Sequence, residues 1–236
     1  MWGREFMSAD CRFRTQVFYS IGMKRYGLEF RLMKGQASVT IPLHKPKVQE
    51  KLFFLLSGVI VSIPLTSFIY AFPDLVLSLI PKTFAAILSV VFLAPFVEEF
   101  SKAYPLFYRH AETERSIFTL GFLVGLGFGI VELIEYVVFQ QVPILVRLPG
   151  VFFHASATSI VAFGIAKKKP IRFYLVAVVL HLSNNLLATF WPLYLFGGPA
   201  IISLTYFLCW FFYQKTEDRM IPFSSRPVED ALQKKV

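Results

Sequence analysis

The stretch TFAAILSVVFLAPFVEEFSK, residues 83–102, joins an apolar run to three ionisable side chains. Residues 83–97 carry no charge, and Glu98, Glu99 and Lys102 lie at the end of the run. A membrane-spanning helix needs about 20 mostly apolar residues, and each charged side chain near its centre costs roughly 2.5–3.5 kcal/mol on insertion. Charged side chains placed there are expected to face one another between helices. The stretch therefore predicts a buried polar site inside a membrane protein.

The composition of the whole chain supports a membrane protein. The 236 residues are 56% hydrophobic and the mean hydropathy is +0.58, whereas soluble domains usually hold about 45–50% apolar residues. The formal charge is +9, but the basic residues cluster between apolar runs, where anionic lipid headgroups and topology signals place them. This distribution predicts contact with the lipid bilayer and no nucleic-acid partner. The two cysteines, Cys11 and Cys209, are too few for a disulfide framework.

Six apolar runs are long enough to be membrane spans, which predicts an all-α, polytopic fold with the polar site between helices 2–5. Lys and Arg residues alternate between the connecting segments: residues 1–51 hold ten, 109–115 two, 167–172 four and the C-terminal tail five, whereas the other three loops hold one, one and none. An excess of basic residues marks the cytoplasmic side. We therefore expect a multi-pass protein of the cell membrane with both termini in the cytoplasm. The predicted spans are 52–72, 83–108, 116–139, 149–166, 171–191 and 195–213.

This arrangement divides the chain into three parts. Residues 1–50 alternate basic and aromatic side chains and are expected to form a cytoplasmic or membrane-surface segment. Residues 51–214 are expected to form the transmembrane helical domain, and residues 215–236 a cytoplasmic tail. No oligomeric state is predicted.

The spacing of the ionisable side chains places several of them on shared helix faces. Residues three or four apart are neighbours on a helix, so Lys102 can pair with either Glu98 or Glu99. By the same rule His181 and Asn185, in HLSNN, share a face. Four predicted helices therefore carry buried polar groups, and one shared cavity would satisfy all of them. The ionisable members are Glu98, Glu99, Lys102, Glu132, Glu135, His154 and His181.

The third predicted span is rich in glycine just before Glu132. Four glycines lie at positions 121, 125, 127 and 129. Small residues allow neighbouring membrane helices to approach closely. We therefore expect tight helix packing around the polar site.

Carboxylates and neutral imidazoles support two kinds of hydrolysis. They can ligate Zn²⁺, which lowers the pKa of a bound water to about 7, and Glu98, His154 and His181 are the candidate ligands. Without a metal, a buried glutamate can act as general base on a water, with a histidine sharing that work. Asn185 beside His181 is then a candidate hydrogen-bond donor to a developing oxyanion. Serine and cysteine mechanisms have no supporting sequence context, and no HExxH motif occurs.

Four motifs in order resemble those of the PrsW-type intramembrane proteases, relatives of the CAAX prenyl endopeptidase and Abi superfamily. The resemblance covers residues 90 to 190, most of the helical region. It implies an endopeptidase that hydrolyses membrane-anchored protein substrates inside or beside the bilayer, as a zinc enzyme or by a metal-independent glutamate mechanism. The motifs are APFVEEFSK (94–102), GLGFGIVELIEY (125–136), RLPGVFFHASATSIVAFGIA (147–166) and HLSNN (181–185).

The resemblance also implies roles for single residues. Glu98 matches the water-activating or metal-binding glutamate, and Glu99 matches its partner. Glu132 and His154 match further active-site positions. The pair of His181 with Asn185 matches the last motif.

Two positions depart from the family pattern. Leu133 follows Glu132 where the family usually has asparagine, and Glu135 is an additional carboxylate one turn later. Asn185 stands where aspartate is frequent in the family. Because asparagine cannot act as a base, we expect it to donate to an oxyanion or to orient another group.

Two other classes of function fit buried Glu and His side chains. A proton- or cation-coupled carrier uses chains of such groups, but the sequence shows none of the inverted repeats typical of carriers. A non-catalytic membrane scaffold or immunity-type protein needs no chemistry from them, and an unchanged phenotype in Glu98→Gln would favour it. The motifs taken together favour the protease.

Overall fold

The computed structural model describes residues 29–33, 36–40, 45–76, 80–108, 113–190 and 192–218. The chain divides into two units, Met1–Leu43 and His44–Val236. The first unit contains an antiparallel strand pair, β1 (Glu29–Met33) and β2 (Gln36–Thr40), which was not predicted. Most of the predicted surface segment 1–50 and tail 215–236 lies outside the described residues. The division of the chain proposed from the sequence stays a prediction.

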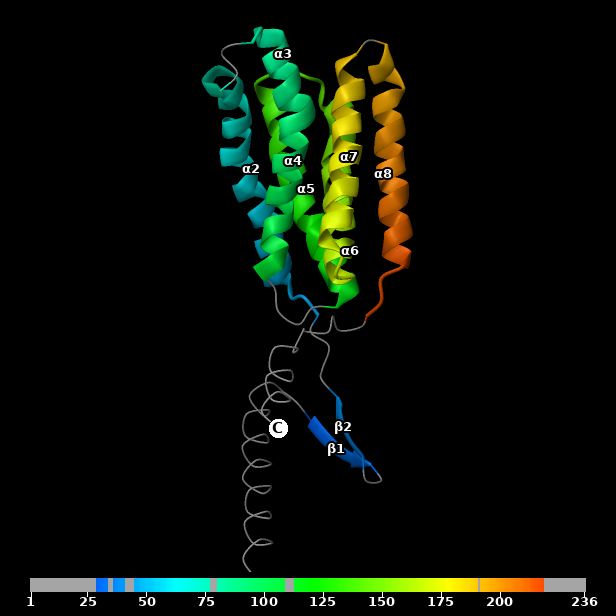
Figure 1. Cartoon of the computed structure of the whole chain (residues 1–236). Coiled ribbons are helices and arrows are strands. Elements are labelled where there is room, and N and C mark those ends of the chain that lie inside the picture. Colours follow the sequence, from blue (N-terminus) through cyan, green and yellow to red (C-terminus); the bar gives the residue numbers. More distant parts are fainter. Residues whose placement is uncertain are drawn as a thin grey trace, which may run out of the picture. The chain divides into compact units, whose positions relative to one another are not determined.

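The second unit is a set of helices that run side by side (Figure 1). In the part of the chain that the structure describes, four helical segments are long and apolar enough to cross a membrane: Lys82–Tyr108, Glu114–Val138, Ile144–Ala166 and Pro170–Thr189. The predicted all-α membrane fold is confirmed for this unit, and the count of six spans stays a prediction. The elements are α2 (Val48–Val76), α3 (Lys82–Ile87), the π-helix η1 (Leu88–Leu93), α4 (Ala94–Ala103), the 3₁₀ turn η2 (Tyr104–Tyr108), α5 (Glu114–Val138), α6 (Ile144–Ala166), α7 (Pro170–Thr189), the 3₁₀ turn η3 (Leu193–Leu195) and α8 (Gly197–Gln214).

Each predicted span coincides with helical structure, and the largest difference at a single bound is at the start of α6. This helix begins at Ile144, whereas the predicted span began at residue 149. Pro149 lies in its second turn, where a missing N–H removes only one intrahelical hydrogen bond and the helix can continue. The predicted start at residue 149 was therefore wrong, because the proline was taken as the beginning of the helix.

Glycines on two faces of α5 allow close contact with α6 and α2. A Cβ atom at Gly121 would lie 2.5 Å from the Cβ atom of Ala162 on α6. A Cβ atom at Gly127 would overlap the carbonyl oxygen of Leu55 on α2. The predicted tight packing of the glycine-rich helix is therefore confirmed.

The helical segment 82–108 changes geometry along its length. α3 passes into the π-helix η1, which is followed by α4 and then by η2. Pro95 lies in the first turn of α4, directly after the π-helix. π-Helical segments are rare and occur frequently at functional sites. Glu98, Glu99 and Lys102 all lie on α4, just beyond this segment.

One end of the helical unit is held together by polar contacts. Lys167, after α6, donates hydrogen bonds to both carboxylate oxygens of Glu114 at the start of α5, each at 2.7 Å. The backbone N–H of Glu217, after α8, donates to Glu114 Oε2 at 3.1 Å. The described chain also enters α2 at this end (Figure 1). The first and last helices of this unit, α2 and α8, therefore begin and end at the same end of it, and the placement of the two termini stays a prediction.

Candidate active site

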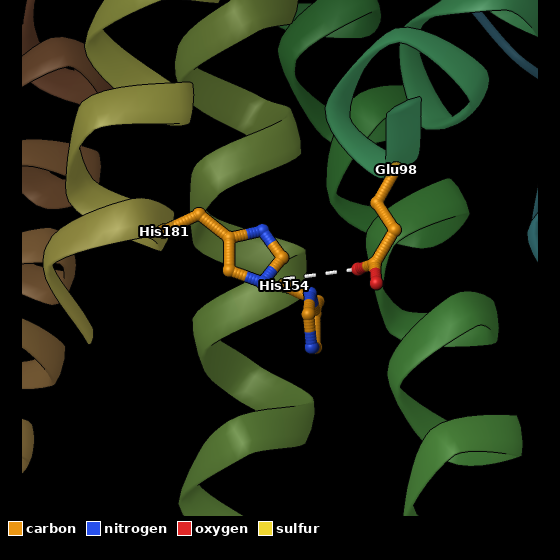
Figure 2. Close-up of side chains that lie close together, drawn as sticks. All are labelled: Glu98, His154 and His181. Atoms are coloured by element: carbon orange, nitrogen blue, oxygen red, sulfur yellow. Dashed lines mark ion pairs between the residues drawn. The ribbon is translucent and has the colours of Figure 1, made fainter. Parts of the chain in front are cut away.

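Glu98 on α4, His154 on α6 and His181 on α7 point toward one another (Figure 2). One possible ligand atom from each residue lies within 4.8 Å of the others. The histidines are 2% and 3% exposed, and the Glu98 side chain is 13% exposed. Three helices therefore contribute one group each to a common, buried point. We call these three residues the central cluster.

His181 is oriented by the two adjacent glutamates. Its Nδ1 lies 2.9 Å from Glu99 Oε1, and its Nε2 lies 3.8 Å from Glu98 Oε2. Because a carboxylate only accepts, the short contact places the ring proton on Nδ1, which donates to Glu99. The lone pair of Nε2 then faces Glu98. The predicted partnership of Glu98 and Glu99 thus consists of two different contacts with one histidine.

His154 is oriented from α5. Its Nε2 lies 2.5 Å from Glu132 Oε2, so Nε2–H donates to that carboxylate. Its Nδ1 is then an acceptor, and Lys102 Nζ donates to it at 2.9 Å. Glu132 is held in turn by Arg147, whose Nη2 lies 3.3 Å from Glu132 Oε1. The Arg147 guanidinium carbon lies 3.3 Å from the ring centre of Tyr136.

Lys102 places a positive charge next to the central cluster. Its side chain is fully buried, and Nζ lies 2.6 Å from Glu99 Oε1 and 3.8 Å from Glu98 Oε2. Nζ also lies 4.5 Å from the ring centre of Phe128, a favourable cation–π distance. The predicted role of Lys102 as a charge partner is confirmed. Lys102 and Arg147 thus supply two positive charges to the three carboxyl groups of the site, those of Glu98, Glu99 and Glu132.

Two buried phenylalanines line the histidines. The Phe153 ring lies 5.5 Å from both imidazole rings, nearly perpendicular to each. The Phe128 ring lies 5.3 Å from that of His154. Both rings are at most 2% exposed. They exclude water from one side of the site, which strengthens the electrostatic contacts there.

A comparison with known protein families shows which family the chain belongs to. Residues 48–213 match the family described as PrsW family intramembrane metalloprotease. The chain belongs to the PrsW family. The match includes every predicted site residue, and the resemblance found in the four motifs is thereby confirmed. No curated protein and no solved structure matches the chain.

PrsW membership implies a metal, and the side chains present fit zinc. Catalytic zinc sites combine three His or carboxylate ligands with an open position for water or substrate, and the central cluster offers two imidazoles and one carboxylate. Among the described residues, Glu98 Oε2 and Glu99 Oε2 are buried oxygens that accept no hydrogen bond. A cation bound by Glu98 would give the first of these oxygens a partner. Carboxylates on the other nitrogens of zinc-bound histidines, as Glu99 and Glu132 provide, are usual.

Five of the six predicted site residues are joined by direct contacts, and the sixth is placed differently. Asn185 lies on α7 one turn beyond His181, as its spacing predicted. Its Nδ2 donates to the backbone oxygen of Val90 on η1 at 3.0 Å. In the described contacts, Asn185 thus holds backbone rather than a member of the central cluster.

Two contributors to this PrsW site were missed from the sequence. Arg147 was counted only as a loop charge, although its place in the first turn of α6 lets it reach Glu132. Tyr174 was counted only as part of a span, yet its hydroxyl donates to the backbone oxygen of Phe96 at 2.8 Å. A lone arginine near a buried glutamate was the available signal for the first. No sequence signal indicated the second.

Proposed function

We propose that this PrsW protein is an endopeptidase that hydrolyses peptide bonds of membrane-anchored proteins with a water held at Glu98, His154 and His181. The observation that carries the proposal is the convergence of these three buried side chains from separate helices. Their helices are long and apolar enough to lie in a bilayer. A site so placed favours substrates that are themselves anchored in the membrane, and PrsW membership supports a protein substrate.

We further propose Zn²⁺ as the cofactor, held by the central cluster. When bound, Zn²⁺ polarises a carbonyl and lowers the pKa of a bound water to about 7. The chain's own carboxylates prepare the imidazoles for this ion. Glu99 accepts a hydrogen bond from Nδ1–H of His181, which leaves the Nε2 lone pair of that ring available. Glu132 accepts one from Nε2–H of His154, and the Nδ1 lone pair of that ring would serve the ion in place of its present donor, Lys102.

A metal-independent mechanism is the second candidate, and the position of Lys102 favours it. Lys102 already supplies a cation beside Glu98 and donates to His154 Nδ1, the nitrogen that a metal would need. In this mechanism Glu98 acts as general base, taking a proton from water as its oxygen attacks the peptide carbonyl. The same carboxylic acid then gives the proton to the leaving amine.

The test combines cleavage with metal content in purified protein. The probe is a single-span peptide carrying a quenched fluorophore pair across its outer juxtamembrane segment. We expect wild-type protein to cleave it, and Glu98→Gln, His154→Ala and His181→Ala each to lower kcat by about 10³-fold or more. We also expect about one zinc per chain in the wild type and loss of zinc in all three variants.

The matched control is Glu114→Gln. It removes a partly buried carboxylate that pairs with Lys167 at the end of the helical unit. It is expected to keep zinc and cleavage. If the wild type stays free of zinc after zinc addition but cleaves, the metal-independent mechanism replaces the zinc mechanism. If Glu98→Gln cleaves as fast as the wild type, the proposed site is wrong.

A further inference from the structure

The backbone oxygen of Val90 has no usual partner within its own helix. In an α-helix this oxygen would accept from the N–H of residue 94, but Ala94 N–H bonds to the oxygen of Ser89, five residues back, in the π pattern. The next π-type donor would be residue 95. That residue is Pro95, which has no N–H. Both regular donors to the Val90 oxygen are therefore lost.

Asn185 supplies the missing donor from α7. Its Nδ2 lies 3.0 Å from the Val90 oxygen. An unpaired carbonyl is expensive away from water, and more so in a membrane, where only protein groups can satisfy it. An aspartate at this position could not make this contact as a carboxylate because it has no proton to donate.

Asn185 thereby links the π-helix to the residues that follow it. Among the described residues, three side-chain hydrogen bonds join α7 to the helical segment 82–108: Asn185 to the Val90 oxygen at 3.0 Å, Tyr174 to the Phe96 oxygen at 2.8 Å, and His181 to Glu99 at 2.9 Å. A π-helix holds one extra residue per turn relative to an α-helix. If η1 changed to α-helical geometry, the residues after it would rotate about the helix axis by about 100° relative to the residues before it. Such a rotation would aim Glu98 away from the histidines.

We propose that Asn185 is a positioning residue that fixes the π-helical register of η1 by replacing the N–H that Pro95 lacks, and so aims Glu98 and Glu99. This rests on the proposed function, with Asn185 acting through the backbone of η1 and not on the substrate. A direct role as oxyanion donor makes a different prediction. If Asn185 acts by positioning, a substitution of Pro95 that restores the backbone N–H can recover the activity lost in an Asn185 variant. If Asn185 contacts the substrate directly, that substitution cannot.

The decisive experiment is a double-mutant test with Asn185→Ala, Pro95→Ala and the two together. Asn185→Ala is expected to lower kcat for the quenched single-span peptide by about 10–100-fold with little change in KM, because misplacement by about an ångström costs this much. Pro95→Ala restores a backbone N–H that can bond Val90. The double variant is therefore expected to recover most of the lost kcat. Asn185→Asp is expected to be no better than Asn185→Ala.

A second readout does not depend on cleavage. Hydrogen–deuterium exchange of the peptide covering 86–97 is expected to quicken in Asn185→Ala and to return toward the wild-type rate in the double variant. Loss of kcat without rescue, in a folded and active Pro95→Ala background, would overturn the inference and assign Asn185 to the substrate. If Pro95→Ala does not fold, unchanged exchange in Asn185→Ala overturns it. Absence of cleavage by wild-type protein counts against the proposed function and leaves the exchange test standing.

Discussion

Lys102 is fully buried, and its charge is matched by close partners. Nζ lies 2.6 Å from Glu99 Oε1 and donates to His154 Nδ1 at 2.9 Å. Removing one member of a buried ion pair leaves the other charge without compensation, which typically costs more than the pair itself contributes. Lys102 therefore serves stability and also sets which nitrogen of His154 carries the proton.

At this scale we predict the outcome of Lys102→Met, which keeps the length of the side chain and removes its charge. The free energy of unfolding of metal-free protein is expected to fall by about 3–5 kcal/mol. Adding Glu99→Gln removes the uncompensated charge while keeping an oxygen that accepts from His181. The double variant is therefore expected to regain at least about 1 kcal/mol, measured by reversible unfolding in mixed micelles.

The matched control for this pair is an exposed one. Arg115 Nη1 lies 3.9 Å from Asp218 Oδ2, with both side chains about half exposed. Asp218→Asn is expected to change the free energy of unfolding by at most about 1 kcal/mol, because water screens such pairs. Purely additive losses in Lys102→Met and Glu99→Gln would contradict the coupling proposed for the buried pair.

At the scale of elements, the contact between α5 and α6 depends on the absence of a side chain beside the site. A Cβ atom at Gly125 would overlap the backbone oxygen of His154 and would lie 2.7 Å from the Cα atom of Ala155. Both neighbours are α6 backbone, which cannot move aside as a flexible side chain can. The spacing of the two helices therefore determines where His154 stands.

We predict that Gly125→Ala pushes α5 and α6 apart. The free energy of unfolding is expected to fall by about 1–3 kcal/mol, the usual cost of overpacking. Cleavage is expected to fall as well, because His154 lies on the displaced helix. The control is Gly150→Ala on α6, where a Cβ atom meets nothing within 4 Å. Equal melting temperatures for the two variants in detergent would show that this contact does not limit the packing.

Elements of this protein differ in how far they follow from sequence. The helices were predictable because a hydrocarbon layer about 30 Å thick requires long apolar runs. The central cluster was predictable because charges buried in such runs need one another. The π-helix was not predictable. In a stretch of almost only apolar residues, one extra residue per turn does not change the hydrophobic pattern. The contact of Arg147 with Glu132 was not either, because a lone arginine between spans also serves as a topology signal.

At the scale of the whole molecule, the polar contacts at the two ends of the helices indicate toward which side of the membrane the site opens. Glu114, Lys167 and Glu217 meet at one end of the helical unit. Arg147 lies in the first turn of α6, toward the other end, and contacts Glu132. The Arg147 and Glu132 side chains are 31% and 22% exposed, so the polar site reaches the surface on that side. The side of the membrane on which Arg147 lies is therefore the side from which we expect a substrate to reach the site.

Two matched turn residues test this orientation. Gln141 precedes α6 and Lys168 follows it, both are exposed, and both have positive φ, at 55° and 57°. After Cys11 and Cys209 are replaced by serine, we predict that an impermeant maleimide labels Gln141→Cys in intact cells. Lys168→Cys is expected to react only after permeabilisation, because the basic loop 167–172 marks the cytoplasmic side. The opposite pattern would invert the topology and place the exposed edge of the site toward the cytoplasm. Labelling of both positions from outside would mean that Ile144–Ala166 does not cross the membrane.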